Sequence, residues 1–407
     1  MLEVCGRRAR TVWSLTGLRF VVLVLSCAFL CGLLVSHSLL DERRLGRNQA
    51  VFQAQALLDG RLDIPHDFHD MAVVDGRNYV IYPPLPSLLM LPAVAIWGDR
   101  TNTTVIGLAL SVLSAMVLLS LLRRRGLSGI DALWLTLAFL FGTAYWFCQI
   151  KANEVYFLAH IVAVLCALTA LWEFFGPRRL WLVGLLVGLA FLSRQLSIYL
   201  LVFFALALWS EQSLRPRWVL LRQWLLLGAG FAGCAIAMLV WNQLRFGDAL
   251  ETGYAYLQLP EFLQQRIDRY GLFSWHYLPH NAAYLLIQGL DIEFNAWTME
   301  AGGMNPFGTS LTIASPFVVA AFWARENRRF QLAAWLAIGL CALHQMLYYN
   351  NGWSQINGQR FALDFLPLLL LLCASGVRQW PRSLWQALIV YAVGVNALAL
   401  MIGRHQI

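Results

Sequence analysis

The chain has 407 residues, of which 59% are apolar and only 13% are charged. This composition excludes a soluble globular protein, a disordered chain and a disulfide scaffold, and the continuous apolar runs exclude a β-barrel. The formal net charge of +8 comes from arginines that cluster between apolar runs, a pattern that indicates membrane topology and not nucleic-acid binding.

Apolar runs of about 20 residues can cross about 30 Å of hydrocarbon. We therefore predict an all-α polytopic membrane protein, folded as a single integral-membrane domain over residues 1–407. The first run lacks a small-residue cleavage site, so we expect an uncleaved span and not a signal peptide. Eleven runs are predicted to span the membrane: residues 20–40, 103–122, 130–148, 155–175, 180–193, 196–210, 221–242, 308–324, 330–349, 361–377 and 383–402. The shorter run 84–97 contains Pro86 and Pro92, which favours an interfacial or re-entrant helix.

The arginine clusters predict the orientation of these spans. With eleven spans, the basic N-terminus is cytoplasmic, the C-terminus is outside, and the Arg-rich connectors all lie in the cytoplasm, near residues 123–125, 178–179, 215–222, 325–329 and 378–382. Two large loops, residues 41–102 and 243–307, are then extracytoplasmic. Together with Glu154 they hold 16 of the 22 acidic residues, so we expect polar chemistry there. Their amphipathic stretches, including Gln49–Leu58, Pro260–Ile267 and Tyr270–Ile287, suit the outer membrane interface.

The adjacent acids Asp41 and Glu42 follow the first predicted span. A carboxylate held at a helix end beside lipid has a raised proton affinity, which suits a general base for an acceptor hydroxyl. The alternative is an ion pair with a nearby arginine such as Arg43.

A second group of polar residues lies further along the same loop. His66, Asp67, His69 and Asp70 are packed into five residues, with Asp63 just before them. Histidines three apart with interleaved aspartates could hold a divalent cation, the only cofactor that the sequence suggests, although a solvated loop has the same composition. Asp70 could instead contact the sugar or the acceptor.

Four cations come from connectors or span ends predicted to face outward: Lys151, the only lysine, and Arg194, Arg245 and Arg360. A cation at the rim of a bundle is costly without an anion, so we predict that these groups surround a lipid phosphate or pyrophosphate. The alternative is that they reach towards the headgroups. Glu154 and His160 lie near Lys151 in the sequence and are predicted to contact the substrate.

Several stretches resemble the GT-C superfamily of integral-membrane glycosyltransferases, in the branch with protein O-mannosyltransferases and aminoarabinose transferases. The segments 60–63, 75–79 and 82–86 resemble the first outer loop of bacterial members. Residues 188–194, Gly-Leu-Ala-Phe-Leu-Ser-Arg, resemble a "G-L-A-x-L-T-R" turn. Residues 244–247 and 251–254 resemble the start of the second large loop, and Gly358–Phe361 resembles a "G-x-R-Y" motif before a late span. These likenesses cover most of the chain in the right order.

The resemblance implies a GT-C bundle in the bacterial inner membrane, with a polyprenyl-phosphate sugar as donor and an inverting reaction on the extracytoplasmic side. A catalytic Asp in the first outer loop characterises the family. Asp41 is the matching position, Asn48 lies nearer to the family register, and Asp70 is the alternative base. Where the branch has a Lys before the prolines, this chain has Tyr82, which we assign with Asp63 to the substrate.

The residues and the resemblance imply the same reaction. An acceptor hydroxyl or amine on a glycan, lipid or protein of the envelope is deprotonated by the loop carboxylate and attacks the anomeric carbon, while the cations stabilise the leaving polyprenyl phosphate. No Gly-rich nucleotide loop is visible, consistent with a lipid donor. A transporter or flippase of a lipid-linked sugar would need the same cations but no base, and a scaffold subunit would show no turnover.

Overall fold

The computed structural model describes residues 48–65, 70–154, 156–210, 216–352 and 355–403, and the structural statements below refer to these residues. They are mostly helical. Five helices are long and apolar enough to cross a membrane: α4 (Thr103–Arg124), α7 (Phe157–Phe174), α10 (Arg217–Phe246), α14 (Arg328–Leu347) and α16 (Arg382–Gly403). The chain is therefore a helical protein of the membrane type, as its composition predicts.

The other predicted spans correspond to shorter helices or helix pairs. Four are apolar and of intermediate length: α5 (Gly129–Phe141), α8 (Leu180–Phe191), η3 with α9 (Gln195–Ile198 and Tyr199–Ser210), and α15 with η8 (Leu366–Gly376 and Val377–Gln379). Predicted span 308–324 is broken at Ser315 between α13 (Leu311–Ala314) and η6 (Pro316–Trp323). Span 130–148 continues from α5 into the short α6 (Tyr145–Ile150). The first predicted span, 20–40, lies outside the described residues, so the count of eleven stays a prediction.

The two predicted outer loops form short helices and hairpins. The first loop contains α2 (Gln49–Leu58), the hairpin β1 (Met71–Val74) and β2 (Arg77–Val80), α3 (Leu85–Trp97) and η2 (Gly98–Arg100). The second contains η4 (Tyr254–Tyr256), α11 (Glu261–Tyr270), η5 (Trp275–Tyr277), α12 (Leu278–Leu286), and the hairpin β3 (Ile292–Phe294) and β4 (Ala301–Met304). The amphipathic stretches of the sequence are thus helices or parts of helices. The run 84–97 is helical, with Leu88, Leu89 and Ile96 exposed, and its position at the membrane interface stays a prediction.

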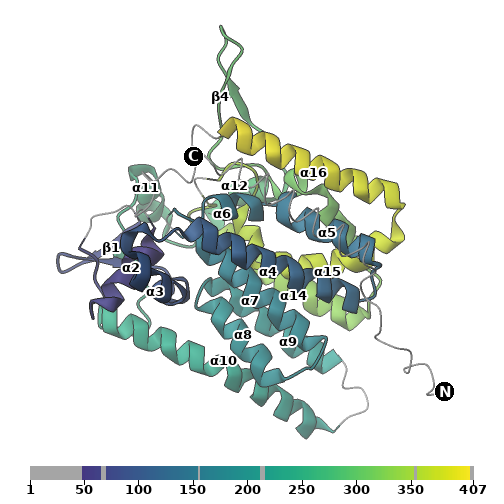
Figure 1. Cartoon of the computed structure of the whole chain (residues 1–407), viewed down its shortest axis with the longest axis horizontal. Coiled ribbons are helices and arrows are strands. Elements are labelled where there is room, and N and C mark those ends of the chain that lie inside the picture. Colours follow the sequence, from purple (N-terminus) through teal and green to yellow (C-terminus); the bar gives the residue numbers. More distant parts are fainter. Residues whose placement is uncertain (1–47, 66–69, 155, 211–215, 353–354, 404–407) are drawn as a thin grey trace.

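Figure 1 shows the long helices side by side, with α2, α3, β1 and α11 gathered at one end, while β3 and β4 project past α16. Close helix packing depends on glycine. A Cβ at Gly184 of α8 would lie 1.9 Å from the Leu227 carbonyl oxygen, and one at Gly230 of α10 would lie 1.9 Å from that of Trp181. Small residues let two helix backbones touch where lipid offers no hydrophobic force between helices.

Three of the five predicted arginine-rich connectors lie together at one end of the bundle. Arg125 pairs with Glu326 at 2.8 Å, and Arg378 donates to the Arg125 carbonyl oxygen at 2.7 Å. Arg382 pairs with Asp131 at 2.6 Å. These contacts join the connectors near residues 123–128, 324–327 and 377–382, which we call the arginine-rich end. The sequence predicts that these connectors share one side of the membrane, and the contacts agree with that grouping.

Candidate functional site

The open end of the β1–β2 hairpin places Asp70 close to Tyr82. Met71 pairs with Val80, so the residue before β1 and the residues after β2 emerge together. Asp70 is half-buried and has a left-handed backbone with φ 62°, a conformation uncommon outside glycine. Burial raises the pKa of the Tyr82 phenol well above its usual value, and the Asp70 carboxylate raises it further. The candidate base therefore faces a protonated phenol.

Four more tyrosines complete what we call the tyrosine cluster. The Tyr82 and Tyr156 ring centroids are 4.3 Å apart, those of Tyr348 and Tyr349 are 4.5 Å apart, and Tyr254 meets Tyr348 edge-on at 6.3 Å. Burial raises the pKa values of Tyr254, Tyr348 and Tyr349. These phenols consequently stay protonated at neutral pH and can donate hydrogen bonds to a ligand. The cluster joins both outer loops to the ends of α7 and α14.

Arg194 lies beside this cluster and already holds an anion of the chain. Its Nε and Nη2 donate to the two carboxylate oxygens of Asp364 at 3.0 and 2.8 Å. Burial by itself would lower the pKa of the guanidinium, but the Asp364 carboxylate outweighs burial and raises it. Gln345 Nε2 donates to the Phe361 carbonyl oxygen at 2.8 Å and to Asp364 at 3.3 Å. In the described part of the chain, Arg194 Nη1 makes no hydrogen bond and remains available for a ligand.

Arg360 approaches the same place from the start of η7 (Arg360–Asp364). It is buried, and it donates to the Gly352 carbonyl oxygen at 2.8 Å and to the Tyr156 hydroxyl at 2.6 Å. Both guanidinium groups make cation–π contacts with the Phe361 ring. Cζ of Arg194 lies 5.1 Å and Cζ of Arg360 lies 5.3 Å from the ring centroid. Two of the four predicted phosphate-binding cations therefore converge.

His160, predicted to contact the substrate, lies next to these two arginines. Its ring stacks at 6.3 Å from the Phe361 ring and is fully buried. Neither ring nitrogen has a hydrogen-bond partner among the residues that the structure describes. The imidazole is consequently a buried polar group beside two guanidinium groups.

The other two predicted cations have different surroundings. Arg245 is 4% exposed and donates to the Val80 carbonyl oxygen and to Asn242 Oδ1, so it ties β2 to the end of α10. Lys151 Nζ lies 2.7 Å from a carboxylate oxygen of Glu154, within one connector. Glu154, predicted to contact the substrate, is thus an ion-pair partner. The structure therefore brings together Arg194 and Arg360, whereas Arg245 and Lys151 contact groups of the chain elsewhere.

The remaining predicted residues divide into those with a described environment and those without one. Asn48 is the N-cap of α2, and its Nδ2 donates to the Ala152 carbonyl oxygen at 2.7 Å, which is a structural role. Asp63 precedes the Ile64–Asn78 bridge, away from the Met71–Val80 end of the hairpin. Five predicted residues lie outside the described residues: Asp41, Glu42, His66, Asp67 and His69. Within the described ranges no three metal-ligating side chains gather, and the metal prediction stays untested.

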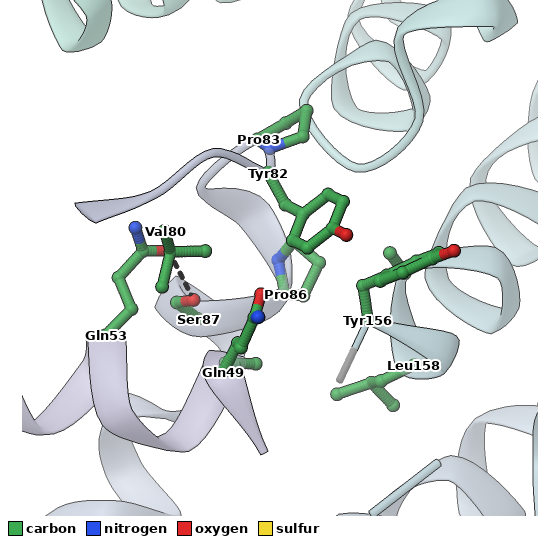
Figure 2. Close-up of a pocket in the computed structure, with 11 residues that line it drawn as sticks. Gln49, Gln53, Val80, Tyr82, Pro83, Pro86, Ser87, Tyr156 and Leu158 are labelled. Atoms are coloured by element: carbon green, nitrogen blue, oxygen red, sulfur yellow. Dashed lines mark hydrogen bonds between the residues drawn. The ribbon is translucent and has the colours of Figure 1, made fainter. Parts of the chain in front are cut away.

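A pocket opens between α2, the start of α3 and the start of α7 (Figure 2). Its enclosed space is about 10 Å³, which is room for roughly one water molecule. Gln53 and Ser87 lie on one side and Tyr156 on the other, with Tyr82 above them. Tyr82 and Tyr156 line the pocket and also belong to the tyrosine cluster.

Sequence reasoning did not find the partners of these groups. Asp364 lies inside the predicted span 361–377, and neither it nor Tyr156, Tyr348 and Tyr349 is among the predicted site residues. An acid buried in a membrane span is itself a signal, since such a group is costly unless it is paired. The tyrosines carry no such signal, because single tyrosines at span ends are normal membrane-interface residues.

Comparison with known proteins gives no assignment: no family model matches the chain, and neither does any curated protein or solved structure.

Proposed function

We propose that the chain is an inverting glycosyltransferase that moves a sugar from a polyprenyl-phosphate donor to an acceptor hydroxyl or amine at the extracytoplasmic membrane surface. The observation that carries the proposal is that Arg194 and Arg360 converge on the Phe361 ring, at 5.1 and 5.3 Å from its centroid. Arg360 also donates to the Tyr156 hydroxyl, and the Tyr156 ring lies 4.3 Å from that of Tyr82, the residue beside Asp70. The site would thus offer a candidate base and candidate phosphate-binding groups in one place.

In the proposed step the carboxylate acts as the base, and the guanidinium and phenol groups stabilise the leaving phosphate. The acceptor O–H or N–H gives its proton to the Asp70 carboxylate as its oxygen or nitrogen bonds to the anomeric carbon. The bond from that carbon to the phosphate oxygen breaks on the opposite face, which inverts the configuration, and the electron pair leaves with the polyprenyl phosphate. Arg194 Nη1 and the phenols stabilise the charge on the leaving phosphate, because donors fixed in place need no rearrangement as that charge develops.

Several features of the fold support a lipid-linked donor. The site lies where the two predicted outer loops meet the ends of apolar helices, so a prenyl chain could remain in lipid while its phosphate reaches the arginines. The bundle also presents broad lipid-facing surfaces, for example the side chains of Leu221, Leu225 and Ile236 on α10, which are more than half exposed. A soluble sugar nucleotide would gain nothing from this position.

The test is turnover of prenyl-phosphate sugars by purified protein in nanodiscs, with Asp70→Asn against a matched control. Asp75 is exposed and also has a left-handed backbone, with φ 50°, so Asp75→Asn makes the same change where Asn is equally well tolerated. We expect Asp70→Asn to lower kcat by a factor of about 10² to 10⁴ with an unchanged Kd for the donor, as for removal of a general base. Asp75→Asn should match the wild type.

Two results would contradict the proposal in different ways. A protein that consumes no donor, but moves it between leaflets of a vesicle equally well with Asn at position 70, is a transporter. If Asp41→Asn abolishes transfer while Asp70→Asn does not, the base is Asp41, the position that the family resemblance favours, and Asp70 is not the catalytic carboxylate.

A further inference from the structure

We infer that the tip of the β3–β4 hairpin, residues 294–300, enters the headgroup layer of the membrane beside α16 and anchors the second outer loop to lipid. The inference does not rest on the proposed function, because this surface takes no part in the proposed reaction. It depends on three features of the hairpin: its exposed apolar side chains, the hydrogen bonding of its turn, and its place next to α16.

The tip of the β3–β4 hairpin presents large apolar side chains to its surroundings. Trp297 is 95% exposed, Met299 is 78% exposed and Phe294 is 59% exposed. The tip of the other outer hairpin, β1–β2, is formed by Asp75 and Gly76, which is the polar turn expected in water. Tryptophan is enriched at the membrane–water interface, where its ring lies at the level of the headgroups. The β3–β4 tip thus has the composition of a membrane contact.

The backbone of this turn is hydrogen-bonded within the hairpin. Asn295 Oδ1 accepts from the backbone N–H groups of Trp297 at 2.9 Å and Thr298 at 3.1 Å. The backbone N–H of Met299 donates to the Asn295 carbonyl oxygen at 2.9 Å, and the backbone N–H of Asn295 donates to the Glu300 carbonyl oxygen at 2.9 Å. A backbone polar group without a partner is costly where water is scarce. A turn bonded in this way can therefore enter the headgroup layer at little cost.

The base of the hairpin is fixed to α16, so the position of the tip follows from that helix. Met304 of β4 is buried in the apolar core, and β4 packs against α16. Figure 1 shows the hairpin next to the end of α16 that lies away from the arginine-rich end, and it projects past that helix at a wide angle to the long helices. α16 is long and apolar enough to cross a membrane, and Val390 and Met401 on it are more than half exposed. A hairpin that leans outward from the predicted outer end of a lipid-facing helix brings its tip to the membrane surface.

The charges near the tip favour apolar contact with lipid over attraction to anionic headgroups. Asp291, Glu293 and Glu300 are acidic, and residues 270–324 contain no lysine or arginine. Anionic lipids attract basic segments, so this hairpin gains nothing from them. The free energy of entry must therefore come from burial of apolar side chains such as Trp297, for which a zwitterionic lipid is sufficient.

The test is photocrosslinking from the tip, with the full chain in nanodiscs of phosphatidylcholine. p-Benzoyl-phenylalanine, whose excited ketone bonds to nearby C–H groups, replaces Met299, and the adducts are identified by mass spectrometry. We expect lipid adducts from this position. The matched control carries the same residue in place of Arg77, which is exposed at the polar β1–β2 tip, and should give no lipid adduct above background.

Trp297→Ser tests the side chain on which the inference depends. In the protein with the photoreactive residue at position 299, this change should abolish most of the lipid adduct, because the tip loses its largest apolar group. Trp297→Tyr keeps an interfacial aromatic side chain and should restore the adduct. Trp275→Ser removes a tryptophan of the same loop that is 70% exposed, and it should leave the yield unchanged. The crosslink from position 299 needs no change at Trp297, so it decides the inference even if the serine variant folds poorly.

Three results would overturn the inference. If position 299 gives no adduct at all, the tip lies in water. If it gives adducts between two copies of the chain, or with another envelope protein in whole cells, and none with lipid, the tip is a protein contact. Equal lipid yields from positions 77 and 299 would show that the apolar side chains of the tip confer no preference for lipid. None of these results concerns donor turnover, so the transferase proposal is tested separately.

Discussion

The arginine-rich end and the tyrosine cluster sit at different ends of the bundle and hold their cations differently. At the arginine-rich end, Arg125 and Glu326 form an ion pair in which both side chains are about a quarter exposed. At the tyrosine cluster, the Arg194 side chain is 15% exposed and that of its partner Asp364 only 1%. Water and salt screen the first pair, whereas the second depends on the geometry of its partner.

This difference shows what an arginine contributes at each end. At the arginine-rich end the charge itself is expected to matter, because the positive-inside rule predicts from it which side of the membrane the connectors occupy, and exposed ion pairs add little to stability. In the tyrosine cluster, burial of the guanidinium charge is unfavourable by itself, and the charge is kept because buried groups of the chain pair with it. A buried, oriented guanidinium is suited to a ligand, which is the property that the proposed function uses.

The largest expected difference in stability concerns one carboxylate at each end. Asp364→Asn leaves Arg194 buried without a counter-charge and should lower the free energy of unfolding by about 3 to 5 kcal/mol. Glu326→Gln makes the same chemical change in a hydrated pair and should cost less than about 1 kcal/mol. The measurement is unfolding of the purified protein by SDS in mixed micelles. Equal costs at the two ends would show that the Arg194–Asp364 pair is as well solvated as the surface pair.

A smaller effect is expected from the hydroxyl of Tyr156. Tyr156→Phe removes the acceptor of a buried Arg360 N–H and should cost about 1 to 3 kcal/mol, the penalty for an unsatisfied buried donor. Tyr256→Phe is the matched control, since Tyr256 is 43% exposed and lies outside the tyrosine cluster. The same micelle unfolding assay measures both variants. If the two cost the same, Arg360 does not depend on the Tyr156 hydroxyl.

The raised pKa values of the phenols have the smallest expected effect on stability at neutral pH, because they change the free energy of unfolding only in alkaline solution. A group whose pKa is higher in the folded state contributes stability that is fully present below its unfolded pKa, near 10 for tyrosine, and that is lost as the pH rises through the folded pKa. Stability should therefore fall above about pH 10, and Tyr349→Phe should reduce that fall. The measurement is the free energy of unfolding of the wild type and of Tyr349→Phe at pH 7 to 11. The arginine-rich end stays charged over this range, so Glu326→Gln should not change the slope.

Much of the helical framework follows from local sequence. The runs 103–122 and 383–402 became α4 and α16 because helix length follows from residue count and the apolar composition leaves no alternative in lipid. Span 308–324 shows the limit. Its composition is that of a continuous span, but Ser315 and Pro316 divide it into α13 and a 3₁₀-helix, and Ser315 Oγ donates to the Gly142 carbonyl oxygen at 2.6 Å.

The site was predicted only in part. Arg194 and Arg360 were identified because a cation at a predicted outer turn requires an anion, and the structure brings the two together. Arg245 and Lys151 satisfy the same sequence rule but contact Val80, Asn242 and Glu154. The rule says that a single charge at such a position is unfavourable without a partner. It does not say which group of the chain or of a ligand pairs with that charge.

The sequence by itself determined the helical membrane class, the grouping of three arginine-rich connectors and the presence of polar loops, because each depends on the composition of a continuous segment. Tertiary structure decided that Asp364 holds Arg194, that five tyrosines from four segments meet, and that Gln53 and Ser87 face Tyr156 across a pocket. These are contacts between residues tens to hundreds of positions apart. Their free energy depends on distance and burial, and no local pattern in the chain records either quantity.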